Sequence, residues 1–351
     1  MNVALAYNVK PESETFHAIV SPNPNNHLNN LNPQIDTYAE WDTWETINAV
    51  KDAIACHNNV TLIEADDQAY NKFRELKPDL VFNIAEGAFG VSREAQIPAM
   101  LDMLQIPYTG SDALTLGICL DKARTKEILS YYKVPNAKFF VADKIEDAEN
   151  QNLEFPLIVK PISEGSGKGI FASSFVNNKE ELKREIKRIT TEYNQSALVE
   201  EFLTGREFTV AVLGNDGDTK VLPAIEIRYD KYPDGVKPLY SYEAKWILDT
   251  KENEFDVFDC PAKLDKQLEE KINNVCLDTY RVLRCRDWSR IDLRLDKYGE
   301  PSIIEINPLP GIMPDPTENS SFPKAARAAG INYNDMINYV LAAAVKRLNL
   351  L

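Results

Sequence analysis

The first 84 residues alternate three short apolar segments with two helical ones, and this alternation limits the fold more than any other feature of the chain. The apolar segments are residues 2–8, 60–65 and 78–84. Ile47, Val50 and Ile54 recur at helical spacing between the first two segments, and a second, short helix reaches about Leu76. This order predicts a parallel sheet with helices on both faces.

The length and charge of the chain restrict its partners. With 351 residues it is long enough for two or three domains. It has 39 Lys and Arg residues against 54 Asp and Glu residues, a formal net charge of −15. Such a balance argues against a nucleic-acid or anionic membrane surface, but ATP remains compatible because Mg²⁺ bridges phosphates to carboxylates. No apolar run approaches the roughly 18 residues of a membrane span, and no basic leader precedes the first strand, so we expect a cytoplasmic protein.

Cysteine and histidine give little indication of chemistry. The five cysteines are odd in number and contain no C-x-x-C pair, which predicts free buried thiols in a reducing compartment. The three histidines have no partner at ligand spacing. Zinc and Ser-His-Asp chemistry are therefore not indicated.

The remainder of the chain continues the α/β pattern. Helices are expected over 93–105, 119–132 and 264–285, whereas residues 11–34 form a long Asn- and Pro-rich loop. From Glu207 onward the pattern is rich in strands. Three consecutive α/β units describe this order best.

A hairpin at 289–307 carries the most informative polar residues. Glu305 and Asn307 are two apart on one expected strand, so they share a face of the sheet. If Tyr298-Gly299 is a two-residue turn, Asp292 faces Glu305 directly, and the three side chains form an all-oxygen site that suits Mg²⁺. A type I turn with a glycine bulge is the alternative, and it would shift the register by one residue and separate the acids. A solvated outer sheet face is the third interpretation.

The glycine-rich segment E-G-S-G-K-G-I at 164–170 resembles a phosphate-binding loop. A P-loop needs a glycine five residues before Gly167 and a hydroxyl after Lys168, but these positions hold Ile162 and Gly169. Residues 169–176 read as a strand, not a helix. The segment is therefore predicted to be a loop between two strands that folds over phosphates, with the strand-borne Lys160 beside it.

Seven motifs in the same order resemble the ATP-grasp carboxylate–amine ligases, and within them D-alanine–D-alanine ligase. They are I-P-Y-T-G-S, L-D-K-A-R-T-K, P-L-I-V-K-P-I-S-E-G-S-G-K-G, V-E-E-F-L-T-G-R-E-F-T-V, Y-E-A-K, S-R-I-D and E-I-N-P-L-P-G. The resemblance implies an α/β, three-domain ATP-grasp fold that begins with an N-terminal parallel-sheet domain. The domains would be an N-terminal substrate domain over 1–118, a central domain with the lid over 119–206, and a C-terminal domain with the magnesium site over 207–351.

The resemblance also implies the nucleotide contacts. They are Lys122, Lys160, Ser166, Glu200, Phe202, Leu203, Glu207 and Ile304. The two lysines would bind the ATP phosphates, Glu200 would accept from the adenine amino group, and Glu207 would hold the ribose hydroxyls.

The metal and catalytic residues follow from the same resemblance. Asp292, Glu305 and Asn307 would bind two Mg²⁺ ions, or Mn²⁺ in their place, which agrees with the hairpin argument. The oxyanion of the tetrahedral intermediate would be stabilised by Arg290 and the amide of Gly311. Lys245 would reach the transferring phosphate, and Ser166 would act from the lid.

The departures from the family concern the substrates rather than ATP. No residue clearly matches the family's acid after the first strand, although Glu40, Asp42 and Glu45 are nearby. Trp246 stands where a tyrosine is usual, and Glu86 where a histidine is common.

Two further positions raise their own questions. Lys168 stands where an uncharged residue is expected, and it would contact either phosphate or solvent. A different and more polar pocket formed by Glu86, Arg93 and Glu94 is a further hypothesis.

The resemblance implies a ligase that joins two amino acids through an acylphosphate, with a place in peptidoglycan synthesis. D-Alanine and other amino acids are alternative substrates. A non-catalytic nucleotide-binding protein and an ATP-grasp phosphotransferase are alternatives from other classes. We expect small-molecule amino-acid partners and, by resemblance alone, a homodimer.

Overall fold

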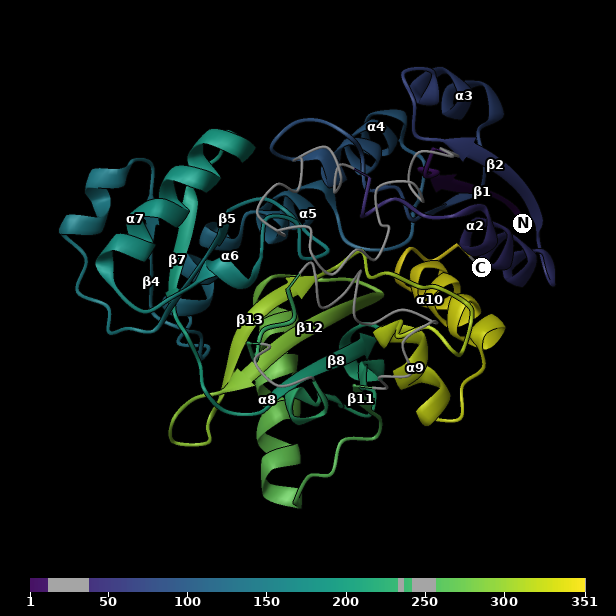
Figure 1. The fold of residues 1–351 in the computed structure, drawn as a ribbon. Helices are drawn as coiled ribbons and strands as arrows, with labels where there is room; N and C mark the ends of the chain where they lie inside the picture. The colour runs from purple at the N-terminus through teal and green to yellow at the C-terminus, as the bar shows by residue number, and fades with distance from the viewer. Residues whose placement is uncertain (12–37, 233–236, 242–256, 351) are drawn as a thin grey trace, which may run out of the picture.

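The computed structural model describes residues 1–11, 38–232, 237–241 and 257–350, and it contains three sheets. In Figure 1 a four-stranded sheet lies to the left, a six-stranded sheet lies at the lower centre, and the N-terminal sheet lies at the upper right. The long loop expected at residues 11–34 falls almost entirely outside the described residues.

The N-terminal sheet is parallel, with strand order β2-β1-β3. Its elements are β1 (Asn2–Tyr7), α2 (Trp44–Ala55), β2 (Asn59–Glu64), α3 (Ala69–Leu76), β3 (Leu80–Asn83), the 3₁₀ turn η2 (Arg93–Ala95) and α4 (Gln96–Leu104). Leu5 of β1 packs in one core with α2, whereas Ala4 packs in a second core with α3 and α4. The predicted parallel sheet with helices on both faces is confirmed.

The second sheet is antiparallel, with strand order β4-β7-β5-β6. Its strands are β4 (Phe139–Ala142), β5 (Leu157–Pro161), β6 (Phe175–Val176) and β7 (Ala197–Glu201), and α7 (Lys179–Arg188) packs against it. The strand expected over 169–176 was too long. Only Phe175 and Val176 pair with β5, because Ala172–Ser174 forms a 3₁₀ turn.

Two helices stand where a single helix was expected over 119–132. They are α5 (Ala113–Leu120) and α6 (Lys122–Tyr131). Asp121 separates them, since its extended backbone ends α5 and its carboxylate accepts from the amides of Ala123 and Arg124 as the N-cap of α6. The break places Lys122 at the first position of a helix.

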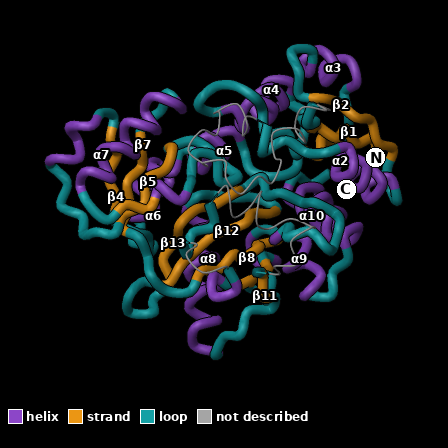
Figure 2. Tube along the Cα trace, in the orientation of Figure 1, coloured by secondary structure: helices purple, strands orange, loops and turns teal. Residues whose placement is uncertain are grey.

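The third sheet has the order β11-β10-β8-β12-β13, with β9 paired to β8. Its elements are β8 (Glu207–Leu213), β9 (Lys220–Val221), β10 (Ile225–Ile227), β11 (Phe258–Asp259), α8 (Lys266–Val282), β12 (Trp288–Leu295), β13 (Pro301–Asn307), α9 (Ser321–Ala328) and α10 (Tyr333–Arg347). Figure 2 shows β8, β12 and β13 together above α8. Helix α10 packs on α2, where Asn338 donates to the carbonyl of Ala53 at 2.9 Å, so the chain's two ends share one core.

The β12–β13 hairpin differs from its expected form in an instructive way. The two-residue turn was wrong, because Asp296 donates to the carbonyl of Glu300 and three residues lie between them, with Gly299 at φ +81°. A second irregularity follows at Ile304, since Leu293 pairs with Ile303 whereas Asp292 pairs with Glu305. The bulge offsets the longer turn, and Asp292 faces Glu305 after all.

Two smaller expectations have mixed outcomes. All five cysteines are free, as predicted, but Cys56 is exposed and Cys260 only partly buried. Among the described residues, none of the helices combines the length and apolarity that crossing a bilayer requires.

Candidate active site

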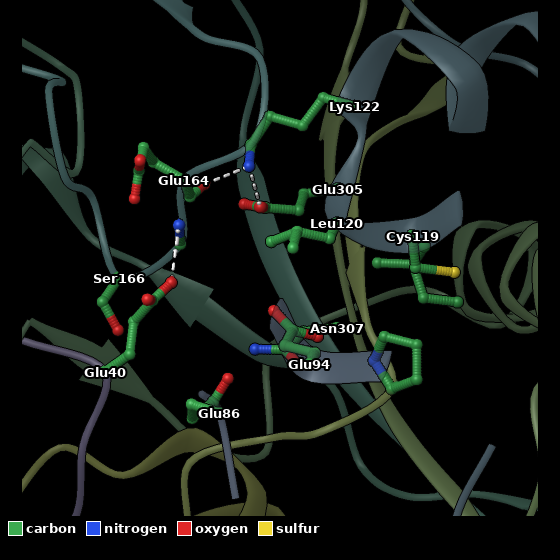
Figure 3. A pocket seen from close by; sticks show the side chains of 13 residues that line it. Glu40, Glu86, Glu94, Cys119, Leu120, Lys122, Glu164, Ser166, Glu305 and Asn307 are labelled. Carbon is green, nitrogen blue, oxygen red and sulfur yellow. Dashed lines mark hydrogen bonds and ion pairs between the residues drawn. The ribbon is translucent and has the colours of Figure 1, made fainter. Parts of the chain in front are cut away.

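A pocket lies where the ends of the three sheets approach one another. It is lined by Glu40, Glu86, Glu94, Cys119, Leu120, Lys122, Glu164, Gly165, Ser166, Glu305, Ile306, Asn307 and Pro308. Glu86 follows β3, Glu164 follows β5, and Glu305 lies on β13, so each sheet contributes one wall. Figure 3 shows Lys122 reaching between Glu164 and Glu305.

The three predicted metal ligands share the end of the hairpin. Lys122 lies 2.8 Å from Glu305, and Arg290 lies 3.0 Å from Asp292. The amide oxygen of Asn307 accepts from the backbone of Leu309 at 2.9 Å. Among the described residues no cluster of three His, Cys, Asp or Glu side chains suits an ion, so the predicted metal site would need Asn307 as its third ligand. The all-oxygen donor set fits Mg²⁺, with Lys122 and Arg290 balancing the two carboxylates.

Of the four predicted catalytic residues, the structure describes Arg290, Gly311 and Ser166. Arg290 precedes Asp292 by two residues on β12, and its Nε atom is buried without a hydrogen-bond partner. Gly311 lies just beyond β13 in open space, since a Cβ there would meet nothing within 4 Å. Lys245, like Trp246, lies outside the described residues.

The predicted phosphate lysines are buried and paired with acids. Lys160 on β5 lies 2.5 Å from Glu200 on β7, and Lys126 lies 2.6 Å from the other oxygen of the same carboxylate. Burial alone would lower the pKa of Lys160, but Glu200 and Glu305 outweigh it and raise that pKa. Burial opposes ionisation of Glu200, yet the two lysines lower the pKa of its carboxyl. The lysine and the acid therefore both carry charge.

The predicted adenine and ribose contacts lie at the junction of the second and third sheets. Phe202 makes an edge-to-face contact with Phe175, with ring centroids 4.7 Å apart, and Leu203 and Ile304 are partly buried. Glu207 accepts from Arg294 at 3.1 Å and from the Tyr229 hydroxyl at 2.8 Å.

Glu207 is buried, and its surroundings shift the pKa of its carboxyl. Burial raises the pKa of Glu207 even though Arg294 opposes the shift. Arg294 also lies 4.5 Å from the centre of the Phe202 ring, so it connects the predicted adenine and ribose contacts.

The glycine-rich loop folds back on itself over the pocket. Ser166, Gly167 and Gly169 have φ values of +52°, +75° and +72°, and the amide of Lys168 donates to the carbonyl of Gly165 at 2.9 Å. Ser166 lines the pocket, as predicted for a lid residue. Lys168 lies 2.7 Å from Glu164 within its own loop, so the lysine that was expected to meet phosphate or solvent pairs here with an acid of the lid.

Glu40 connects the N-terminal part of the chain to this loop. Its carboxylate accepts from the amide of Gly165 at 2.8 Å and receives two bonds of 2.8 Å from one guanidinium nitrogen of Arg93. Arg93 also donates to the carbonyl of Ser163 at 2.8 Å. Both side chains are 7% exposed, so this is a buried, charge-assisted connection.

Two further acids, Glu86 and Glu94, complete the pocket, whereas Arg93 of the hypothesised polar pocket is buried beside Glu40 and does not line it. Burial and the neighbouring Glu40 raise the pKa of Glu94 to about 8. Burial and the neighbouring Glu94 raise the pKa of Glu86 well above its ordinary value. These two carboxyls favour the neutral form unless a cation joins them.

Lys126 and Arg294 escaped the sequence analysis, and Glu40 was named there only as one of three acids without an assigned role. Lys126 lies four residues after Lys122 on α6, and Arg294 continues the alternation of Arg290 and Asp292 on β12. Helical and strand periodicity could have found both. Glu40 has no comparable signal, because its partner Gly165 is 125 residues away.

Comparison with known proteins shows which family the chain resembles. A family model described as D-ala D-ala ligase C-terminus matches residues 127–342. An uncharacterized protein, y4sG, of Sinorhizobium fredii is 35% identical over 300 residues, covering 83% of this chain and 84% of that protein. A D-alanine–D-alanine ligase of Pelotomaculum thermopropionicum is 31% identical over 313 residues, covering 86% and 92%.

The fold is similar to that of a solved structure as well. The crystal structure of D-alanine–D-alanine ligase from Bacillus anthracis complexed with ATP aligns with a TM-score of 0.67 over 99% of both chains, at 21% identity. The expected ATP-grasp fold is confirmed. The family-model match spans more than half of the sequence, and the P. thermopropionicum relative exceeds 30% identity over most of both chains. The chain therefore belongs to the D-alanine–D-alanine ligase family of ADP-forming carbon–nitrogen ligases.

Proposed function

We propose that the chain joins two amino acids, using ATP bound between the second and third sheets. Family members use ATP and Mg²⁺. The observation that carries the proposal is the position of Lys122, which donates to the carbonyl of Glu164 in the lid and lies 2.8 Å from Glu305 of the candidate metal site. One lysine thus connects the loop expected over the phosphates with the carboxylate expected on the metal.

The reaction would proceed in two steps. A carboxylate oxygen of the first amino acid attacks the γ-phosphorus of ATP, the bond to the β,γ-bridging oxygen breaks, and ADP leaves. The amine of the second amino acid then attacks the acyl carbon, phosphate leaves, and the amine proton passes to solvent or phosphate. Such phosphoryl transfer depends on positioning and charge neutralisation, which Lys122, Lys160 and the lid amides would supply.

Individual roles follow from the contacts. Asp292, Glu305 and Asn307 would hold Mg²⁺, as two ions and with Mn²⁺ as a substitute, and the bound metal would supply positive charge against the phosphates. Arg290 would face the oxyanion together with the amide of Gly311, and its unpartnered Nε supports that assignment.

The remaining assignments belong to the same proposal. Phe202, Leu203 and Ile304 would contact adenine, and Glu207 would hold the ribose. Glu200 would accept a hydrogen bond from the adenine amino group with a carboxylate oxygen that also contacts a lysine. Lys245 would contact the transferring phosphate. The proposal includes three domains, over 1–118, 119–206 and 207–351. It also includes a homodimer and a cytoplasmic location. D-Alanine is the first substrate to test, and its use would place the enzyme in peptidoglycan synthesis.

The test is phosphate release from ATP, measured with pairs of D- and L-amino acids and with products identified by mass. A ligase releases phosphate only when both amino acids are present and yields a dipeptide of the expected mass. ATP binding without phosphate release from any pair would contradict the proposal. Phosphate transfer that needs no amine would indicate a phosphotransferase instead.

A further inference from the structure

The pocket under the lid contains more acids than the proposed reaction needs. Within the described part of the chain, five glutamates line it against one lysine, Lys122. They are Glu40, Glu86, Glu94, Glu164 and Glu305. Three of the five have cationic partners, namely Arg93 for Glu40, Lys168 for Glu164 and Lys122 for Glu305. Glu86 and Glu94 remain.

Glu94 is buried without a partner. Its residue is 7% exposed, and within the described part of the chain its carboxylate makes no hydrogen bond and no ion pair, although it lines the pocket. Glu86 has no such partner among the described residues either. Both carboxylates therefore face the pocket rather than protein partners, whereas most carboxylates in buried residues have partners. Figure 3 shows both side chains in the pocket, on the side opposite Lys122.

The backbone holds the two glutamates close together. Gly87, at φ +72°, approaches Arg93 so closely that a Cβ would lie 2.7 Å from the Arg93 carbonyl oxygen. The amide of Gly87 donates to Asn8 at 2.9 Å, and its carbonyl accepts from Trp41 at 3.0 Å. Glu86 therefore sits beside Glu94 on a fixed segment just beyond the carboxyl end of β3, the edge at which α/β sheets bind ligands.

We propose that Glu86 and Glu94 bind the cationic groups of a basic amino acid, so that one substrate of this ligase carries a side-chain ammonium or guanidinium. The inference rests on the proposed ligation of two amino acids. The single ammonium of a neutral amino acid would match one of the two carboxylates and leave the other unpaired. A methyl side chain offers neither of them a donor. A basic amino acid supplies two cations, one for each carboxylate.

The test compares basic and neutral amino acids in the intact enzyme and in two isosteric variants, Glu86→Gln and Glu94→Gln. The control is Glu75→Gln, which alters an exposed glutamate on α3. Lysine, ornithine and arginine are compared with alanine, each as both enantiomers, by kcat/KM for phosphate release. Each variant is first shown to bind ATP. Calorimetric binding of lysine and of alanine is measured in parallel, so that recognition is tested without turnover.

We expect the basic amino acids to exceed alanine in kcat/KM. Glu86→Gln and Glu94→Gln should each lower the ratio of kcat/KM for a basic amino acid to kcat/KM for alanine by about 10- to 100-fold, the cost of one lost charged hydrogen bond. Glu75→Gln should keep the ratio. Loss of lysine binding in Glu94→Gln would support the inference even if no dipeptide forms. In that case only the proposed ligation would be contradicted.

Two results would overturn the inference. In the first, alanine is preferred and the ratio is the same in all variants, which leaves ligation intact but removes the cationic substrate. In the second, the glutamine variants raise the Mg²⁺ concentration needed for half-maximal rate and leave the ratio unchanged, which would make the pair a metal site.

Discussion

Asp292 lies directly opposite Glu305 across the β12–β13 pair because two irregularities offset each other. The turn at 297–299 is one residue longer than the simplest hairpin turn, and the bulge at Ile304 adds one residue on the other strand. Either irregularity alone would turn one of the carboxylates to the opposite face of the sheet. The pairing of the acids is therefore a property of the whole hairpin.

Neutralising either acid should remove the metal-dependent step. For Asp292→Asn and Glu305→Gln we expect phosphate release to fall by about 100-fold or more, with a higher Mg²⁺ requirement, because a carboxylate ligand is lost. The control is Glu300→Gln in the same hairpin, whose pair with Lys271 is exposed. Mg²⁺ titrations of phosphate release measure both quantities. Losses of similar size in the control would show that the hairpin, rather than the ligand, had been damaged.

The hydrogen bond between Gly165 and Glu40 predicts a role for the lid's attachment. In Gly165→Ala the new Cβ would lie 2.3 Å from a carboxylate oxygen that Arg93 holds in place. The loop must then move away from Glu40, and we expect kcat/KM for ATP to fall about tenfold, as for a lost hydrogen bond to a charged group.

A matched substitution separates this effect from the general cost of replacing glycine. Gly217→Ala adds a Cβ that meets nothing within 4 Å and should leave kcat/KM for ATP unchanged. Steady-state kinetics at varied ATP concentration compare the two variants. Equal values for both would mean that the contact between Glu40 and the lid does not affect ATP use.

The parts of the fold that depend on local pattern were predictable from the sequence. Strand and helix periodicity gave the parallel N-terminal sheet and placed Glu305 and Asn307 on one face. The resemblance supplied Lys122 and Lys160; Lys122 lines the pocket, and Lys160 is buried on β5 beside Glu200. The bulge at Ile304 was not predictable, because no residue type or sequence pattern marks this extra residue in the strand.

Contacts between distant segments were also beyond the sequence. Glu40 was one of three acids near the first strand, and nothing local distinguished it from Asp42 or Glu45. Its role depends on a contact with Gly165 that only the assembled sheets create. The hypothesis of a polar pocket formed by Glu86, Arg93 and Glu94 placed two of its residues correctly, since Glu86 and Glu94 line the pocket, but only the structure shows that Arg93 pairs with Glu40 instead.

The buried cluster around Glu200 predicts unequal costs for two lysines. Lys160→Met removes one of two cations from a carboxylate that is 3% exposed, and breaking such a pair costs about 3–5 kcal/mol. Lys138→Met is the matched control, since Lys138 pairs at 3.4 Å with the adjacent Glu201 but is 77% exposed. An exposed pair contributes about 0–1 kcal/mol.

Chemical denaturation of both variants and a measurement of ATP affinity test this prediction. Lys160→Met should unfold at a lower denaturant concentration and bind ATP more weakly, whereas Lys138→Met should resemble the wild type in both. If Lys160→Met kept full stability, Lys126 alone would be sufficient to neutralise Glu200.

Glu94 predicts a variant that is more stable and less selective. Its pKa is about 8 in the folded chain, against roughly 4.3 for an unfolded glutamate, because of burial and the nearby charge of Glu40. The folded state thus holds the proton more tightly than the unfolded state. Between about pH 4 and pH 8, the contribution of Glu94 to the free energy of unfolding falls as the pH rises. The unfolded chain ionises this glutamate freely in that range, whereas the folded chain must keep the proton or bury a charge.

Glu94→Gln removes this dependence, because glutamine has a similar shape and no charge. The other groups acting on Glu94 are Glu86, Arg93, Lys122 and Glu305, and they remain in place. We expect the variant and the wild type to have similar melting temperatures near pH 4.5. At pH 8.5 the variant should be more stable by about 1–3 kcal/mol, since the wild type then holds an ionised carboxylate in the pocket and the variant does not.

Thermal unfolding of both proteins across this pH range tests the expectation, with Glu75→Gln as the exposed control that should follow the wild type at every pH. A variant less stable than the wild type at pH 8.5 would mean that the Glu94 carboxylate already has a partner in solution. Higher stability combined with a lower preference for basic amino acids would instead show that the enzyme keeps a destabilising charge in its pocket for the sake of its substrate.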